Sequence, residues 1–329
     1  MRFGFQLPTA IEGLYMKPGS VKISDFVKIA TTAEKLGFHS LWVNDHITPW
    51  KRSSPNNKPE FPNWYEVLMT LSYCAAVTTE IKLGVSVLVM PFRDPVIIAK
   101  QAATIDVFSG GRFILGIGLG GPRQEFDKLY PQLAESKRGD LLDEGIEAVE
   151  LLLNNSNVSF NGNYYSFDNV SLNPRSLQNP LPIYIAGNSI TAFKRVAKFA
   201  TGLITTSAPF SNLREKIKKL HETVEYADRN PSKIDVMLSA VLCIDHTTEK
   251  AAQRLDSSML GLRFSEEYKK SPGHFLIGSP NEVAEKIHQL AEIGVTQIVP
   301  QHTAGDTPAQ FMDQMYFLGE EVAPLFKLP

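Results

Sequence analysis

Three polar residues follow an apolar stretch near the N-terminus: Asn44, Asp45 and His46. A carboxylate beside an imidazole suits general acid–base chemistry, because imidazole titrates near neutral pH and a carboxylate can orient it. The preceding stretch, Phe38–Val43, has the aromatic and β-branched residues of a buried strand. A rigid strand ending in such a pair is a common way for α/β enzymes to place reactive groups. A cap at Asp45 and a satisfied rim histidine at His46 fit the same residues.

The elements that must position this pair alternate regularly between strand and helix. Eight strands are predicted, at Arg2–Leu7, Phe38–Val43, Ile81–Met90, Phe113–Gly118, Ile183–Ala186, Leu203–Thr206, Val236–Ile244 and Thr296–Pro300. Helices are predicted at Ser24–Leu36, Trp64–Val77, Pro95–Phe108, Arg138–Leu153, Thr191–Phe199, Leu213–Arg229, Thr248–Met259, Asn281–Ile293 and Pro308–Leu318. This alternation predicts one α/β domain over residues 1–329, a (β/α)8 TIM barrel, rather than two domains.

Two segments exceed the minimal barrel. Asn157–Asn169 reads as a hairpin insertion with Asn161-Gly162 as its turn. Leu260–Phe275 is a polar, lysine-rich segment between the seventh and eighth strands. It fits either a lid over the active site or surface decoration.

The carboxyl ends of barrel strands face one common site. Here they carry few charges, several glycines and a belt of apolar residues, which favours a large flat cofactor over a metal ion. These ends supply Gln6, Asn44, Asp45, His46, Val89, Met90, Gly118, Gly120, Ala186, Gly187, Asn188, Ser189, Thr205, Thr206, Asp245, Gln301 and His302.

Two glycine-containing turns could approach a phosphate. Gly116–Gly121 satisfies GxGxxG literally, but Pro122 follows at once and three strand–helix units come first, so a Rossmann fingerprint is disfavoured. Glycines there more plausibly let a ligand approach the backbone. The AGNS stretch Ala186–Ser189 precedes a helix, where backbone N–H groups and the helix dipole favour phosphate. A plain Ser or Thr N-cap is the alternative.

The other histidines form no metal motif. His221, His274 and His288 have no second ligand at a useful spacing. The sequence also contains no HExxH, paired CxxC or GxSxG motif. We therefore expect no metal site and interpret these three histidines as surface residues.

Composition excludes several classes of partner. The 329 residues carry a formal net charge of -2, which argues against nucleic acid because phosphate binding needs a basic face. No stretch has membrane-spanning length. Cys74 and Cys243 lie in apolar runs, as buried thiols in a reducing compartment do. We expect a cytoplasmic protein that acts on a small molecule.

Several stretches together resemble the luciferase-like monooxygenase superfamily. They are MRFGFQLP, GFHSLWVNDHITPW, the long block Ile81–Gly120, KRGDLLDEGIEAVELL and LPIYIAGNS. The resemblance runs in order from Met1 to about Phe199. It implies a (β/α)8 barrel that binds either FMN or the deazaflavin coenzyme F-420.

The stretch DHITPW resembles the DHxxPW motif of F-420-dependent members. That resemblance implies that Asp45 and His46 touch the deazaflavin and serve hydride transfer, and that Trp50 lines the substrate site. It also implies a non-proline cis peptide at Ser86–Val87 that supports the ring. The AGNS stretch then matches the phosphate-binding turn. Cofactor contacts are thus expected at Asp45, Ser86, Val87, Gly118, Gly120, Ala186, Gly187, Asn188, Ser189 and Thr206.

One departure concerns the substrate. Sugar-phosphate members carry a glutamate just after the glycine turn, and the matching position here is Gly121, followed by Pro122. A sugar phosphate is therefore disfavoured. We expect the substrate pocket to include Gln6, Trp50, Met90 and Arg263.

The leading hypothesis is an oxidoreductase in which F-420 exchanges hydride with a small organic substrate. His46 would act as acid/base, and Asp45 would orient His46 or hydrogen-bond the deazaflavin. The first alternative is an FMN-dependent monooxygenase that uses reduced flavin from a separate reductase, with a lid shielding the reaction from water. The second is a non-catalytic flavin-binding protein. The resemblance also implies a homodimer formed through the early helices.

Overall fold

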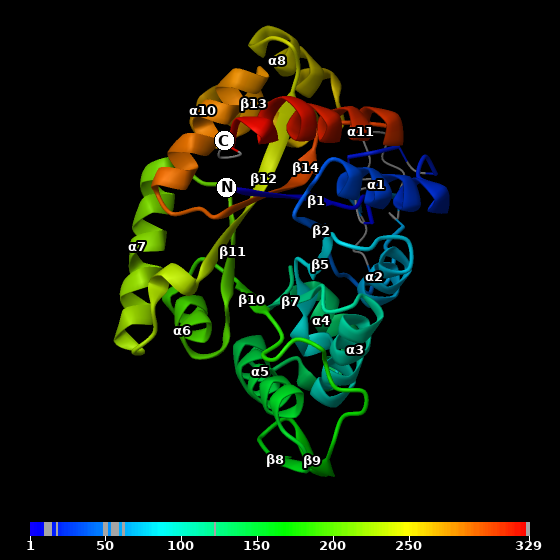
Figure 1. Ribbon diagram of the computed structural model, residues 1–329, viewed down its shortest axis with the longest axis vertical. Coiled ribbons are helices and arrows are strands. Elements are labelled where there is room, and N and C mark those ends of the chain that lie inside the picture. Colours follow the sequence, from blue (N-terminus) through cyan, green and yellow to red (C-terminus); the bar gives the residue numbers. More distant parts are fainter. Residues whose placement is uncertain are drawn as a thin grey trace.

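Eight parallel strands form the core of the protein. The computed structural model describes residues 1–9, 15–17, 19–48, 52–53, 59–60, 63–121 and 123–326. The strands are β1 (Arg2–Gln6), β2 (Ser40–Val43), β5 (Lys82–Val85), β7 (Phe113–Gly118), β10 (Ile183–Ala186), β11 (Gly202–Thr206), β12 (Asp235–Ile244) and β14 (Gln297–Thr303). They pair in the order β10-β11-β12-β14-β1-β2-β5-β7, and β7 pairs with β10 to close the ring (Figure 1). The predicted TIM barrel is confirmed.

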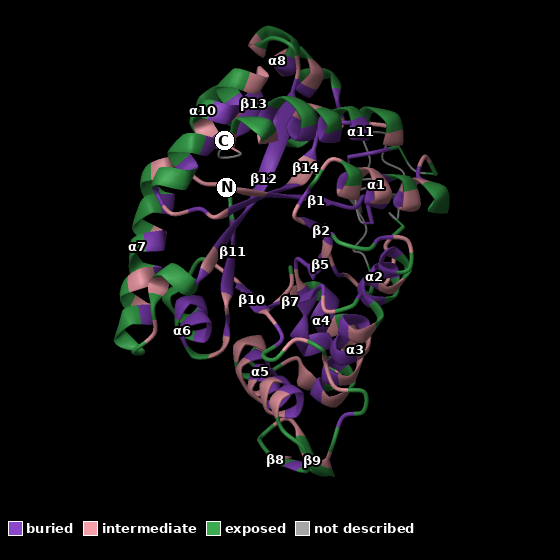
Figure 2. Cartoon of the chain, viewed as in Figure 1, coloured by how far each residue is buried: buried purple, intermediate pink, exposed green. Residues whose placement is uncertain are grey.

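Helices surround the ring, with their buried faces toward the strands and their exposed faces outward (Figure 2). They are α1 (Ile23–Lys35), α2 (Val67–Ala75), α3 (Pro95–Phe108), α4 (Arg123–Leu129), α5 (Arg138–Asn154), α6 (Ile190–Phe199), α7 (Phe210–Tyr226), α8 (Thr248–Ser257), α9 (Gly261–Lys270), α10 (Pro280–Glu292) and α11 (Pro308–Tyr316). Among the described residues, none of these helices is long and apolar enough to cross a membrane.

Two layers of apolar side chains hold the barrel. The strand residues that point outward pack against the helices in one large core. The residues that point inward form a second cluster, which fills the barrel: Trp42, Ile114, Tyr184, Ile204, Met237 and Val299. Because this cluster closes the interior, a ligand can enter only above it, at the carboxyl ends of the strands.

The third predicted strand, Ile81–Met90, is interrupted. It divides into β5 and β6 (Leu88–Val89), with a cis peptide bond between Ser86 and Val87. The predicted cis bond is thus confirmed. A 3₁₀ turn at Met90–Phe92 then leads the chain out of the sheet.

Helices α4 and α9 and a short strand were not predicted. Helix α4 lies between Pro122 and Pro131 in the sequence, so neither proline falls inside the helix, where it would remove a hydrogen bond. Strand β13 (Leu276–Gly278) is too short to show an alternating pattern, and it pairs with the far end of β12.

The two predicted extra segments are both ordered. Strands β8 (Val158–Asn161) and β9 (Ser166–Val170) form the hairpin, which projects beyond α5 in Figure 1. The carboxylate of Glu144 on α5 accepts hydrogen bonds from the backbone N–H groups of Asn163, Tyr164 and Tyr165 and so fixes the hairpin turn. The segment 260–275 forms α9 and a 3₁₀ turn at Pro272–His274.

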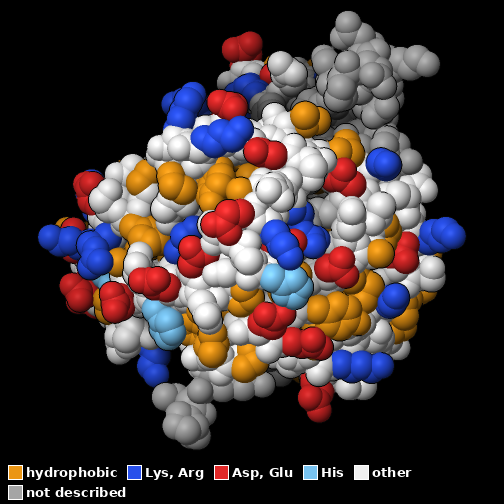
Figure 3. Space-filling model, turned by 90° about the horizontal axis from the view of Figure 1, so that it is seen from above, with side chains coloured by type: hydrophobic (Ala, Val, Ile, Leu, Met, Phe, Trp, Pro, Cys, Tyr) orange, Lys and Arg blue, Asp and Glu red, His pale blue; other side chains and the backbone are white. Residues whose placement is uncertain are grey.

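Charges of both signs are interspersed on the face shown in Figure 3. No large field of one sign covers that face, in keeping with the formal net charge of -2.

Candidate active site

A cavity of about 500 Å³ opens at the carboxyl ends of the strands. Its volume lies within the range of small-molecule and cofactor sites. The lining residues come from all strands of the ring except β1: Asn44, Asp45, His46, Ser86, Val87, Val89, Leu119, Gly120, Gly121, Ala186, Gly187, Asn188, Ile204, Thr206, Ser239 and Gln301. The cavity therefore collects most of the residues that the strand ends predicted.

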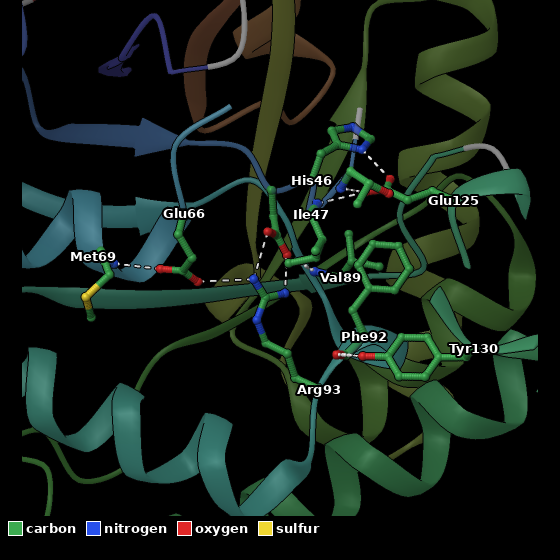
Figure 4. Close-up of polar contacts among 11 residues, drawn as sticks. His46, Ile47, Glu66, Met69, Val89, Phe92, Arg93, Glu125 and Tyr130 are labelled. Carbon is green, nitrogen blue, oxygen red and sulfur yellow. Dashed lines mark hydrogen bonds and ion pairs between the residues drawn. The ribbon is translucent and has the colours of Figure 1, made fainter. Parts of the chain in front are cut away.

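His46 is held by a carboxylate that the sequence did not reveal. Its Nδ1 atom lies 2.6 Å from Oε2 of Glu125 on α4, and the Glu125 side chain is 1% exposed (Figure 4). The other oxygen, Oε1, accepts hydrogen bonds from the backbone N–H groups of Ile47 at 2.7 Å and Thr48 at 2.9 Å. An ionised carboxylate only accepts hydrogen bonds, so the Nδ1 atom of His46 carries a proton. Proton exchange with a bound molecule then falls to Nε2.

Hydrogen bonds keep Glu125 ionised. Burial alone would raise its pKa, but hydrogen bonds from His46 and from the backbone N–H groups of Thr48 and Ile47 lower that pKa below its ordinary value. Glu125 is thus a negative group at neutral pH, and it fixes both the ring of His46 and the loop after β2. The only sign of this contact in the sequence was an acidic residue in the segment after the glycine turn.

Asp45 has different partners. Its carboxylate is fully buried, binds both terminal nitrogens of Arg93 at 2.5 and 2.9 Å, and accepts the N–H of Val89 at 2.9 Å. Arg93 also binds Glu66 at 3.1 Å, and Glu66 caps α2 by accepting the N–H of Met69 (Figure 4). Asp45 therefore ties the end of β2 to β6 and α2. The carboxylate that the structure shows orienting His46 is Glu125.

Three glycines at the turns after β7 and β10 are packed against side chains of the protein. A Cβ atom on Gly118 would lie 2.6 Å from Val87, and one on Gly120 would lie 2.7 Å from Val89. A Cβ atom on Gly187 would lie 2.7 Å from Ala192, and both Gly120 and Gly187 have positive φ. These positions therefore accept only glycine without displacement, and Gly120 and Gly187 line the cavity with backbone alone.

The turn after β10 is joined to β11 by side-chain hydrogen bonds. Asn188 accepts from the hydroxyl of Thr205 at 2.5 Å and donates to Thr206 at 3.3 Å. Ser189 caps α6 by accepting the N–H of Ala192, so it lies at the helix N-terminus beside the cavity. Across the turn after β7, Arg138 donates to the carbonyl oxygens of Leu119 and Gly121. A cation and a helix N-terminus thus flank the same side of the cavity.

Several residues predicted for the site are not in the described lining of the cavity. Met90 is fully buried and faces α5, where a Cβ on Gly145 would lie 2.4 Å from its Cε, so the structure does not bring Met90 to the cavity. Arg263 on α9 donates to the hydroxyl of Tyr15 at 2.8 Å. Gln6 is buried beside the cavity rather than in its described lining. Trp50 lies outside the described residues.

Metal ligands are not clustered in the part of the chain that the structure describes: no group of three or more His, Cys, Asp or Glu residues could hold an ion.

Comparisons with known proteins agree with this geometry. Residues 1–297 match the family model described as luciferase-like monooxygenase. The F-420-dependent glucose-6-phosphate dehydrogenase of Kineococcus radiotolerans is 28% identical over 333 residues, with 93% of each chain covered.

Two solved structures share the fold over nearly the whole chain. An F-420-dependent secondary alcohol dehydrogenase in complex with an F-420-acetone adduct has a TM-score of 0.78 at 20% identity, covering 99% of each chain. The oxygenating constituent of 3,6-diketocamphane monooxygenase from Pseudomonas putida, in complex with FMN, has a TM-score of 0.78 at 19% identity. It covers 100% of this chain and 99% of its own.

Proposed function

The chain belongs to the luciferase-like monooxygenase family, and from that membership and the geometry of its cavity we propose that it is an oxidoreductase that binds coenzyme F-420 and exchanges hydride with a small organic substrate. The observation that carries the proposal is His46, whose ring is fixed by Glu125 at the rim of a glycine-lined cavity. The curated relative named above is F-420-dependent, which supports the deazaflavin over FMN.

The residues present fit a flat cofactor with a phosphate-bearing tail. Ser86, Val87, Gly120 and Gly121 line one wall of the cavity, where a ring system would lie, and Gly118 packs behind Val87. Ala186, Gly187, Asn188 and Ser189 lead into the N-terminus of α6, and Thr206 lies beside them, as a phosphate site requires. When bound, the deazaflavin supplies hydride chemistry.

Each ionisable group then has one role. His46 takes or gives the substrate proton at Nε2, because Nδ1 is committed to Glu125. Asp45 is a positioning residue, since Arg93 and Val89 occupy its oxygens. The pair of rings formed by His46 and Trp64, 4.3 Å between centroids, gives the imidazole a packed side wall.

We propose that α9 acts as the lid. Its Arg263 donates to Tyr15, and the Tyr15 ring packs against His302 at the end of β14, with 5.0 Å between centroids. Segment 260–275 therefore contacts two loops at the mouth of the barrel. A lid there would exclude water from the cavity.

We also propose a homodimer formed through α2 and α3. Met69 and Tyr73 on α2 and Ile97 on α3 are 62%, 44% and 53% exposed. Large apolar side chains exposed on adjacent helices are typical of a protein–protein interface.

The experiment is titration of the purified protein with F-420 and, separately, with FMN, followed by fluorescence quenching. We expect tight binding of F-420, and turnover that is lost in His46→Ala but kept in His221→Ala, a histidine on α7 far along the chain. Preferential binding of FMN with oxygen consumption would instead favour the monooxygenase. Binding without turnover of any substrate would favour a storage protein.

A further inference from the structure

Gln6, the last residue of β1, carries a buried amide without a partner. The residue is 2% exposed, and neither its amide nitrogen nor its amide oxygen has a hydrogen-bond partner among the described residues. Buried amides in folded proteins are almost always hydrogen-bonded, so an exception marks a strained or functional position. Nothing in the packing of β1 requires a polar side chain there.

The Gln6 side chain points into the barrel, toward the mouth. Phe3, Phe5 and Leu7 pack in the outer core, so the alternate residues of β1 face inward. Gly4 confirms this direction, because a Cβ there would lie 2.7 Å from Ser40 and 2.9 Å from Val299, which fills the barrel interior. Gln6 is the next inward-facing residue after Gly4 along β1, and it lies nearer the cavity.

The neighbours of Gln6 on both sides line the cavity. Strand β1 pairs in parallel with β14 at Arg2–Gln297 and Phe3–Ile298, so Gln6 lies on the strand next to the one that carries Gln301. Gln301 lines the cavity and accepts a hydrogen bond from Ser239. On the other side, Asn44 at the end of β2 lines the cavity and accepts from Thr9. Gln6, Asn44 and Gln301 thus come from three neighbouring strands, β1, β2 and β14, on this side of the barrel.

The described lining of the cavity contains no Lys or Arg. The ionisable residues of the described lining are Asp45, which is paired with Arg93, and His46. The other polar groups of the described lining are neutral amides and hydroxyls: Asn44, Ser86, Asn188, Thr206, Ser239 and Gln301. Sites for phosphate or carboxylate groups usually hold Arg or Lys, which form strong charge-assisted hydrogen bonds.

Two described cations lie near the mouth. Arg263 on α9 is bound to the hydroxyl of Tyr15, whose ring packs against His302 at the end of β14. Arg138 holds the turn after β7, next to β10, and β10 lies four strands from β1 in either direction around the ring. The anionic end of a bound molecule is favoured at β7 and β10, where Arg138 and the N-terminus of α6 flank the cavity.

We propose that Gln6, with Gln301 and Ser239, binds the oxygen of an uncharged substrate, a secondary alcohol or the matching ketone, and that the protein does not act on sugar phosphates. The inference rests on the proposed function. Oxidation of such an alcohol breaks its C–H and O–H bonds and forms C=O. The hydride goes to the deazaflavin and the proton to Nε2 of His46, so atoms and charge balance. Gln6 donates its amide N–H to the oxygen as the carbonyl forms.

The test compares Gln6→Met with Gln101→Met, using F-420 as cofactor. Gln101 on α3 also has a buried amide oxygen without a partner, but it lies outside the barrel. Both variants are assayed for F-420 binding, for the midpoint of urea unfolding, and for kcat and KM with 2-propanol, cyclohexanol and glucose 6-phosphate.

We expect Gln6→Met to raise KM for the uncharged alcohols about tenfold or more, since the site loses a hydrogen bond made to the substrate. The same variant should unfold at the same or a higher urea concentration, because an unpaired buried amide is removed. A merely structural Gln6 would raise stability without changing KM, and that result would overturn the assignment. Gln101→Met should leave KM unchanged.

Two further outcomes separate this inference from the proposed function. Turnover of glucose 6-phosphate in preference to the alcohols would overturn the substrate class while F-420 chemistry stands. Failure of the wild-type protein to bind F-420 would overturn the proposed function and this inference together.

Discussion

The Nδ1 atom of His46 lies 2.6 Å from Oε2 of Glu125, although 79 positions separate the two residues in the chain. Glu125→Gln keeps the shape of the side chain but reverses the hydrogen bond, because the glutamine NH₂ donates where the carboxylate accepted. The proton of His46 then moves to Nε2, and the imidazole can no longer accept a proton there. We expect kcat to fall about 10²- to 10⁴-fold, by analogy with the wrong-tautomer variant of a Ser-His-Asp triad.

Glu144→Gln is the matched control for this prediction. Glu144, like Glu125, has three hydrogen-bond partners, but all three are backbone N–H groups of the hairpin turn rather than of the site. Its substitution should leave kcat unchanged in the same steady-state assay. Equal losses in the two variants would show that the effect of Glu125→Gln is structural.

The contrast between these residues also explains what the sequence could predict. Asp45 and His46 were found because an apolar strand and a polar ending are adjacent in the chain, a local pattern. Glu125 lies on a separate short helix, and its contact with His46 depends on how α4 packs against the loop after β2. No local pattern encodes that packing. Arg93 was missed as the partner of Asp45 for the same reason.

The sequence also did not show which way a side chain points from its strand. The barrel followed from strand–helix alternation, which survives small errors in element bounds. Met90 was placed in the cavity because Ile81–Met90 reads as one strand. The break after Val85 and the 3₁₀ turn at Met90–Phe92 send that side chain outward instead. Continuous apolar runs do not reveal which face a residue takes.

Arg93 and Asp45 form a buried ion pair whose loss we expect to be costly. Arg93→Met leaves the fully buried carboxylate of Asp45 with Val89 as its remaining described partner. Breaking a buried pair by removing one partner lowers the free energy of unfolding by about 3–5 kcal/mol. Urea denaturation measures the loss. Arg175→Met is the control, because Arg175 donates to neutral groups at the end of α5, those of Leu153, Asn155 and Ser156, and its loss leaves no buried charge unpaired. It should change stability far less, and similar losses would refute the assignment.

Gly118 should tolerate no side chain. Gly118→Ala places a methyl group 2.6 Å from Val87, so Val87 must shift within the cavity lining. Overpacking of this kind costs about 1–3 kcal/mol, and we expect F-420 affinity to fall by about tenfold or more. Gly273→Ala meets nothing within 4 Å and should change neither quantity. Fluorescence titration and urea denaturation give the two readouts. If the affinity for F-420 is unchanged in Gly118→Ala, the deazaflavin ring does not bind at this turn.

The proposed dimer depends on an apolar surface of α2 and α3. Met69→Lys introduces a charge at a side chain that is 62% exposed in one chain, and a buried unpaired charge opposes association. We expect the dimer to dissociate on size-exclusion chromatography with light scattering. Leu177→Lys, at a similarly exposed residue of the loop before β10, should leave the dimer intact. If the wild-type protein is a monomer in the same measurement, the proposed dimer is refuted.

His39 predicts how stability depends on pH. Burial first, then the charges of Arg2 and Lys82, lower its pKa from 6.5 to about 4, although Asp235 opposes the change. Between these two values the unfolded chain binds a proton on this residue and the folded chain does not. The free energy of unfolding therefore falls as pH falls from 6.5 toward 4, by about 2 kcal/mol at pH 5 from His39 alone. His39→Leu should remove that part of the slope in urea denaturation between pH 7 and 5. Identical pH dependence in the variant and the wild type would mean that His39 is protonated in the folded protein.

The ionised carboxylates of Glu34, Glu125 and Asp245, whose pKa values are lowered, lose their contributions only at more acidic pH and do not mask the difference.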